Sequence, residues 1–163
     1  MKAVINSSPL IALAIIGHLE LLRSRFDQVI VPTSVYAEIT EQGIQRPGVY
    51  QVKQIDWLSI RTPSSTPSWS PQLLGLDPGE RDVLLLAQEF NIDWVIIDER
   101  LGRRIAAAMN LPLKGTLGIL LAAYQTGLLS KADALHAVDL LAVSAIRVSP
   151  RLVSWFQAQL ELK

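Results

Sequence analysis

Residues 77–116, DPGERDVLLLAQEFNIDWVIIDERLGRRIAAAMNLPLKGT, decide the fold of this chain. Asp77 precedes a helical pattern with one apolar stripe, and Trp94–Ile97 is a short apolar run typical of a strand buried on both faces. A second helix is expected over 99–109 and a second strand over 111–114. Strands that alternate with helices of about ten residues predict a parallel sheet covered by helices.

The same alternation extends toward both ends of the chain. Residues 64–76, which include Trp69, form the one long loop expected. The pattern predicts an α/β three-layer sandwich with a mostly parallel central sheet and Rossmann-like topology, formed as a single domain over residues 1–163. The other expected elements are strands over 2–5, 28–31 and 58–61 and helices over 8–16, 19–25, 33–42, 49–54, 116–126, 130–141 and 150–160.

Composition narrows the chemistry that this chain can perform. The absence of cysteine excludes disulfides, thiol nucleophiles and cysteine zinc sites, and it fits a reducing, cytoplasmic compartment. His18 and His136 lie far apart in sequence, so a histidine metal site or catalytic triad is not expected. Fifteen basic residues balance fifteen acidic ones, so contact with nucleic acid requires a local positive patch. No apolar run reaches the roughly 18 residues of a membrane span.

Polar residues follow several of the predicted strands. Loops and helix N-termini converge at the carboxyl ends of parallel strands, which is where ligands bind in such sheets. Two further acidic residues near helix starts, Glu38 and Glu80, can reach the same rim. The residues that directly follow strands and are expected at this rim are Asn6, Ser7, Ser8, Asp98, Glu99, Gly115 and Thr116.

Five blocks of sequence carry a resemblance to a known family. In this order they resemble blocks of the PIN-domain nucleases, and most closely those of the prokaryotic PIN-like branch related to toxins of VapBC-type toxin–antitoxin pairs. The agreement extends from about residue 3 to residue 128. The blocks are NSSPLI (6–11), VPTSVYAE (31–38), LDPGERD (76–82), IIDERLGRR (96–104) and KGTLGIL (114–120).

The resemblance implies a metal-dependent endoribonuclease, usually a homodimer, that a small antitoxin protein holds inactive. Carried onto this chain, the family's acidic quartet falls on Asn6, Glu38, Glu80 and Asp98, with Thr116 near the site. The family generally has aspartate at the first of these positions. Asparagine still offers a carbonyl oxygen to a hard cation, but it contributes one negative charge fewer.

Several carboxylates close together repel one another, so a fold that gathers them usually binds a cation there. Oxygen ligands without cysteine or histidine favour Mg²⁺ or Mn²⁺ over zinc. We expect Asp98 to be the principal direct ligand and Glu80 and Glu38 to be ligands or to position water. Asn6 is expected to act as a neutral ligand or to orient substrate. The secondary candidates are Glu99, Asp82, Thr116 and Ser7.

Each of these residues also has a purely structural interpretation. Asp98 can cap the helix that follows it, and Glu99 can pair with Arg103 one helical turn later. Glu80 stands three residues after Asp77, as in a capping box. Asn6 and Ser7 can be turn residues only.

A positive patch and an apolar helix are the remaining features. RNA phosphates are expected at Arg100, Arg103, Arg104 and Lys114, although a solvated helix face is the alternative. The last helix carries more apolar residues than one packing face needs, so the helices from about residue 130 are expected to form an interface; burial of these residues in the core is the alternative. Two further functions stay open, namely a catalytically weakened or inactive PIN-like module that binds RNA or a partner, and a small-molecule phosphate hydrolase.

Overall fold

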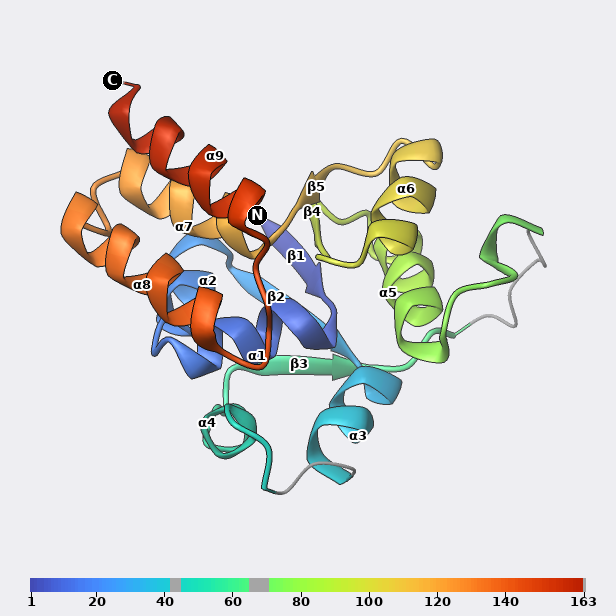
Figure 1. The fold of residues 1–163 in the computed structure, drawn as a ribbon. Helices are drawn as coiled ribbons and strands as arrows, with labels where there is room; N and C mark the ends of the chain where they lie inside the picture. The colour runs from blue at the N-terminus through green and yellow to red at the C-terminus, as the bar shows by residue number, and fades with distance from the viewer. Residues whose placement is uncertain (42–44, 65–70, 163) are drawn as a thin grey trace.

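The computed structural model describes residues 1–41, 45–64 and 71–162. Its centre is a five-stranded, all-parallel sheet with the strand order β3-β2-β1-β4-β5 (Figure 1). The predicted α/β fold with a parallel central sheet is therefore confirmed. The strands are β1 (Lys2–Ile5), β2 (Gln28–Pro32), β3 (Leu58–Arg61), β4 (Trp94–Ile96) and β5 (Leu113–Lys114).

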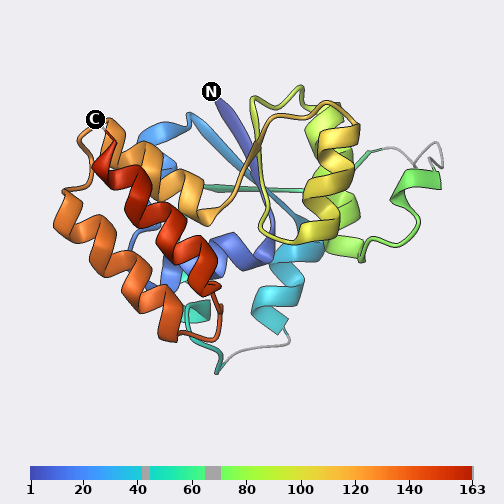
Figure 2. The ribbon, with the colours of Figure 1, turned by 45° about the horizontal axis from the view of Figure 1, so that its top comes forward.

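Helices cover both faces of the sheet. Helices α5 and α6 lie on one side, whereas α7, α8 and α9 pack together on the other in both ribbon views (Figures 1 and 2). The helices are α1 (Ser7–Ile15), α2 (Glu20–Arg25), α3 (Thr33–Glu41), α4 (Val49–Lys53), α5 (Pro78–Glu89), α6 (Arg100–Ala108), α7 (Thr116–Gln125), α8 (Lys131–Val143) and α9 (Pro150–Glu161), with a 3₁₀ turn at Pro71–Leu73. Within the described part of the chain, no helix is long and apolar enough to span a membrane.

Side-chain caps explain where several helices begin. Asp77 caps α5, and its Oδ1 accepts a hydrogen bond from the Glu80 N–H at 2.8 Å. Ser130 and Ser149 cap α8 and α9 in the same way. Helix α3 begins at Thr33, which is the start of its expected range. The predicted end of that helix at residue 42, and Trp69 of the long loop, lie outside the described residues.

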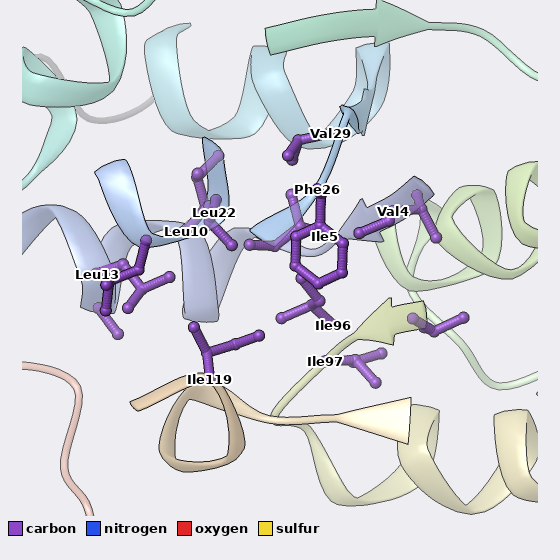
Figure 3. Close-up of a cluster of buried hydrophobic side chains, with 14 of the residues drawn as sticks. Val4, Ile5, Leu10, Leu13, Leu22, Phe26, Val29, Ile96, Ile97 and Ile119 are labelled. Atoms are coloured by element: carbon purple, nitrogen blue, oxygen red, sulfur yellow. The ribbon is translucent and has the colours of Figure 1, made fainter. Parts of the chain in front are cut away.

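The core fills the space between the sheet and its helices. Figure 3 shows side chains from β1 and β4, among them Ile5 and Ile96, meeting Leu10, Leu13 and Ile119 from α1 and α7. All five of these side chains are fully buried. Because β1 and β4 are neighbours with Ile5 opposite Ile96, the segments that follow them leave the sheet side by side. This register creates the rim where the candidate site lies.

Candidate functional site

Asn6 links the ends of the two central strands. Its backbone N–H donates to the Ile96 carbonyl at 3.0 Å, and its side chain is 2% exposed. Asn6 occupies the N-cap position of α1, yet its side chain makes no capping bond. The amide Nδ2 instead donates to Glu99 Oε2 at 3.0 Å, so Asn6 is more than a turn residue. An amide that donates through nitrogen keeps its carbonyl oxygen as an acceptor.

Glu99 is a second anchor of the rim. Besides the Asn6 amide, its carboxylate accepts a hydrogen bond from the Ser8 hydroxyl through Oε1. The alternative in which Glu99 pairs with Arg103 is wrong, because Arg103 Nη1 donates to the Ile97 carbonyl at 2.8 Å. Glu99 therefore fixes the start of α1 to the start of α6.

Asp98 is held by the N-terminus of α7. The Thr116 N–H donates to Asp98 Oδ1 at 2.8 Å, and the Thr116 hydroxyl donates to Oδ2 at 2.6 Å. Asp98 thus binds the first residue of α7 and does not cap α6, whose N-cap is Glu99. Burial raises the pKa of Asp98, and the two hydrogen bonds from Thr116 oppose that shift.

Gly115 determines how closely Asp98 can approach α7. A Cβ atom built at position 115 would lie 2.7 Å from Asp98 Oδ1 and 3.1 Å from Arg103 Nη1. Any larger residue would displace the carboxylate. Glycine is therefore required here by close approach, since its φ of −108° suits any residue.

Glu80 combines a structural and an electrostatic role. Its Oε2 accepts a hydrogen bond from the Asp77 N–H at 3.1 Å, which completes the capping box expected from the sequence. Burial is the main cause that raises the pKa of Glu80, and the Asp77 N–H opposes it. The negative charges of Asp77, Glu99 and Glu38 raise this pKa further.

Glu38 belongs to the same electrostatic cluster. Burial is the main cause that raises the pKa of Glu38, and the negative charges of Asp77 and Glu99 raise it further. A side-chain hydrogen bond from Ser7 and the charge of Arg46 act in the opposite direction. A Cβ atom at Gly79 would lie 3.5 Å from Glu38 Oε2, so this glycine allows α5 to approach α3.

We call Glu38, Asp77, Glu80 and Glu99 the acidic cluster. Sequence reasoning gave Asp77 only a capping role, although the run DPGE already signals two carboxylates in one helical turn. Ser8 was expected at the rim as a residue that follows the first strand, whereas nothing in the sequence pointed to Arg46. Asp82 is not part of the cluster, because its carboxylate binds the Ser34 hydroxyl at 2.7 Å and Arg81 Nε at 3.3 Å.

The donor chemistry of the rim fits a hard divalent cation. The candidate ligands supply only oxygen atoms, and the acidic cluster contains carboxylates that raise one another's pKa, a repulsion that a cation relieves. As the described side chains are placed, however, no three Asp, Glu, His or Cys residues form a group that could hold a metal ion. Asp98 faces Thr116, and Glu80 closes its capping box.

Basic residues and two pockets flank the rim. Lys114 Nζ lies 3.9 Å from the centroid of the Trp94 ring, whereas Arg100 and Arg104 are exposed on α6. A pocket of about 390 Å³ includes Glu38 in its lining. A second pocket, of about 760 Å³, includes Asp98. The rim therefore opens to two hollows of the surface.

Comparison with known proteins agrees with this architecture. A family model described as a PIN domain matches residues 2–161, nearly the whole chain. A search of curated proteins finds no match. The matched range includes every residue of the rim described above.

Proposed function

The chain belongs to the PIN-domain family, whose members are generally nucleases, and from this premise we propose that it is a divalent-cation-dependent endoribonuclease. The reaction would be hydrolysis of RNA phosphodiester bonds. The observation that carries the proposal is the convergence of four segments at one rim. Asn6 and Asp98 follow the neighbouring strands β1 and β4, and Glu99 links the set, because its charge acts on Asp98, on Glu38 of α3 and on Glu80 at the start of α5.

Mg²⁺ or Mn²⁺ would be held by oxygen atoms of Asp98, Glu80 and Glu38 once these side chains turn from their present partners toward one another, with the Asn6 carbonyl as a neutral ligand. When bound, such a cation supplies Lewis-acid stabilisation of the phosphodiester and activates water. The chain's own residues prepare the site. The Thr116 hydroxyl orients the Asp98 carboxylate. The Glu99 carboxylate accepts a hydrogen bond from the Asn6 amide nitrogen and thereby fixes the direction of the amide oxygen. The Ser7 side chain donates a hydrogen bond to the Glu38 carboxylate.

RNA phosphates would bind the basic residues beside the acids. Arg103 and Lys114 line the pocket that contains Asp98, and Arg100 and Arg104 extend the positive surface along α6. A patch of this kind is needed because the formal net charge of the chain is zero.

We further propose that the protein is the toxin of a toxin–antitoxin pair, built as one PIN-like domain over residues 1–163. The helices from about residue 130 would form the interface of a homodimer or the surface that a small antitoxin covers. Support comes from apolar side chains of this region that are exposed and lie outside the Asp98 pocket, namely Leu140 (37% exposed), Val143 (85%) and Leu162 (70%).

A second candidate is a PIN-like module that binds RNA or a partner with weakened or no catalysis. The neutral Asn6 favours it, because its side chain already serves as a hydrogen-bond donor to Glu99. The bonds that Asp98 receives from Thr116 point the same way, since they compete with a cation for the carboxylate.

An RNA hydrolysis assay separates the two candidates. Purified protein, free of any inhibitor, is incubated with structured and single-stranded RNA in Mn²⁺, Mg²⁺ or EDTA. We expect cleavage in the divalent cations, none in EDTA, and loss of cleavage in Asp98→Asn and Glu38→Gln. Asp139→Asn, an exposed residue of α8, is the control and should cleave normally. Equal cleavage by wild type and Asp98→Asn would indicate a contaminant and contradict the nuclease proposal.

A further inference from the structure

The larger of the two pockets extends from the candidate site to the C-terminal helix. Asp98 and Arg103 line one part of it, and Arg151 and Trp155 of α9 line another. Helix α7 connects the two parts, because it packs against α9 and begins at Thr116, the partner of Asp98. The volume of the pocket, about 760 Å³, falls in the range of pockets that bind small ligands.

The polar lining of this pocket favours an anion. Among the described residues that line it, Arg103, Lys114 and Arg151 are cations and Asp98 is the acid. The Ile97 carbonyl orients the guanidinium of Arg103, and the Trp94 ring lies under the Lys114 ammonium. In a chain of zero net charge, this excess of positive charge is local to the pocket.

The α9 wall of the pocket is apolar and aromatic. Trp155 is 44% exposed and Leu152 is 49% exposed, although Phe156 and Leu160 on the same helix are buried in the core. The indole of Trp155 therefore faces the pocket and not the hydrophobic core of the domain. An indole beside guanidinium groups is the combination with which proteins bind unpaired bases and their phosphates.

We propose that this pocket binds one unpaired nucleotide of single-stranded RNA. The base stacks on Trp155, and the adjoining phosphates bind Arg103, Lys114 and Arg151, which leads the strand past Asp98. A base in a duplex is already stacked between its neighbours, so the pocket selects single strands. This inference rests on the proposed nuclease function. RNA binding in the pocket can nevertheless be measured without cleavage, so the two proposals can fail separately.

The test measures RNA affinity in EDTA. Fluorescence anisotropy is recorded with a fluorescein-labelled, single-stranded RNA decamer of mixed sequence and with the same RNA as a duplex. We expect the single strand to bind more tightly, and Trp155→Ala to raise its Kd at least about fivefold. Trp155→Phe should retain most of the affinity. Gln157→Ala, an exposed neighbour on α9 outside the pocket lining, is the matched control and should bind as wild type.

The charge contribution is tested by salt dependence. Arg151→Ala should flatten the slope of log K against log salt by about 0.7, the value expected for one phosphate contact of a single strand. Arg23→Ala removes the same charge from an exposed position of α2 and should leave the slope unchanged. Circular dichroism melting establishes that each variant is folded.

Several results would overturn the inference. One is wild-type affinity of Trp155→Ala for the single strand, and another is equal affinity for duplex and single strand. Unchanged RNA affinity together with loss of a dimer in sedimentation would assign Trp155 to a contact with a second copy. If RNA is never cleaved but binding still depends on Trp155, the pocket is supported and only the nuclease proposal fails.

Discussion

The side-chain amide of Asn6 donates to the Glu99 carboxylate at 3.0 Å, although the two residues are 93 positions apart in sequence. The bond joins the end of β1 to the start of α6 at the rim of the sheet. An aspartate at position 6 would place its carboxylate about 3 Å from that of Glu99, whereas the asparagine places a neutral donor there. The stability of the rim without a cation therefore depends on this amide.

Asn6→Asp should destabilise the protein in EDTA and increase its response to Mn²⁺. The new carboxylate loses the hydrogen bond to Glu99 and adds like-charge repulsion at a buried position, at a cost of about 1–3 kcal/mol. Differential scanning fluorimetry should show a lower Tm in EDTA and a larger upward shift on adding Mn²⁺. Gln51→Glu adds a charge at an exposed position of α4 and serves as control. Unchanged Tm values in both conditions would contradict the prediction.

Gly115→Ala should reduce RNA cleavage far more than it reduces stability. Its methyl group would stand 2.7 Å from Asp98 Oδ1, so the carboxylate must move, and a displacement of about 1 Å can reduce the rate about a hundredfold. Gly118→Ala adds the same group inside α7 at 3.8 Å from its nearest neighbour. Although Gly118 also lines the pocket that contains Asp98, its new methyl group displaces nothing, so this variant should cleave RNA much faster than Gly115→Ala and gain about 0.5–1 kcal/mol of stability. Cleavage rates and urea unfolding of both variants test this; similar rates would disprove it.

Thr116→Val should destabilise the protein and raise the pKa of Asp98. The variant loses the hydroxyl that donates to Oδ2, a bond to a charged group worth about 1.5–3 kcal/mol. Since this hydroxyl lowers the pKa of Asp98, its removal should move the acidic limb of the pH–rate profile to higher pH. Thr126→Val, whose hydroxyl donates only to backbone carbonyls of α7, is the control. A profile identical to that of wild type would refute the role assigned to Thr116.

Glu38 should make the protein less stable as pH rises. Burial raises its pKa in the folded state, so its stabilising contribution is complete below the ordinary pKa of 4.5 and is lost as pH rises through the folded value. The Tm in EDTA should fall less between pH 5 and pH 8 in Glu38→Gln than in wild type. His18 makes the protein more stable as pH rises, because burial lowers its pKa. This contribution is the same in wild type and in Glu38→Gln. Glu41→Gln, exposed on the same helix, should behave as wild type; if Glu38→Gln does so too, the prediction fails.

Hydrophobic periodicity predicted the framework closely. The strands Lys2–Ile5 and Leu58–Arg61 match their expected bounds, and most helices end within two residues of expectation. The strand expected over 111–114 is only Leu113–Lys114, because the Leu111 N–H donates to the Ala106 carbonyl and thereby closes the end of α6. A hydrogen bond of this kind leaves no trace in the pattern of apolar residues.

The membership of the rim was also predictable, but the pairing of its side chains was not. Topology alone brings residues that follow neighbouring parallel strands together, which is why Asn6 meets Glu99 at the rim. That Glu99 binds Asn6 and not Arg103 depends on the register in which Ile5 faces Ile96. The contact of α9 with α7, which brings Trp155 into a pocket with Asp98, likewise arises from tertiary packing.

The central claim is that this rim binds a divalent cation for hydrolysis. Anomalous diffraction from crystals of the protein soaked in Mn²⁺ tests it most directly. The account predicts a peak bound by side-chain oxygens of Asp98, Glu80 or Glu38, with no such peak in crystals of Asp98→Asn. A map without a peak at the rim, recorded from protein that still cleaves RNA in Mn²⁺, would contradict it.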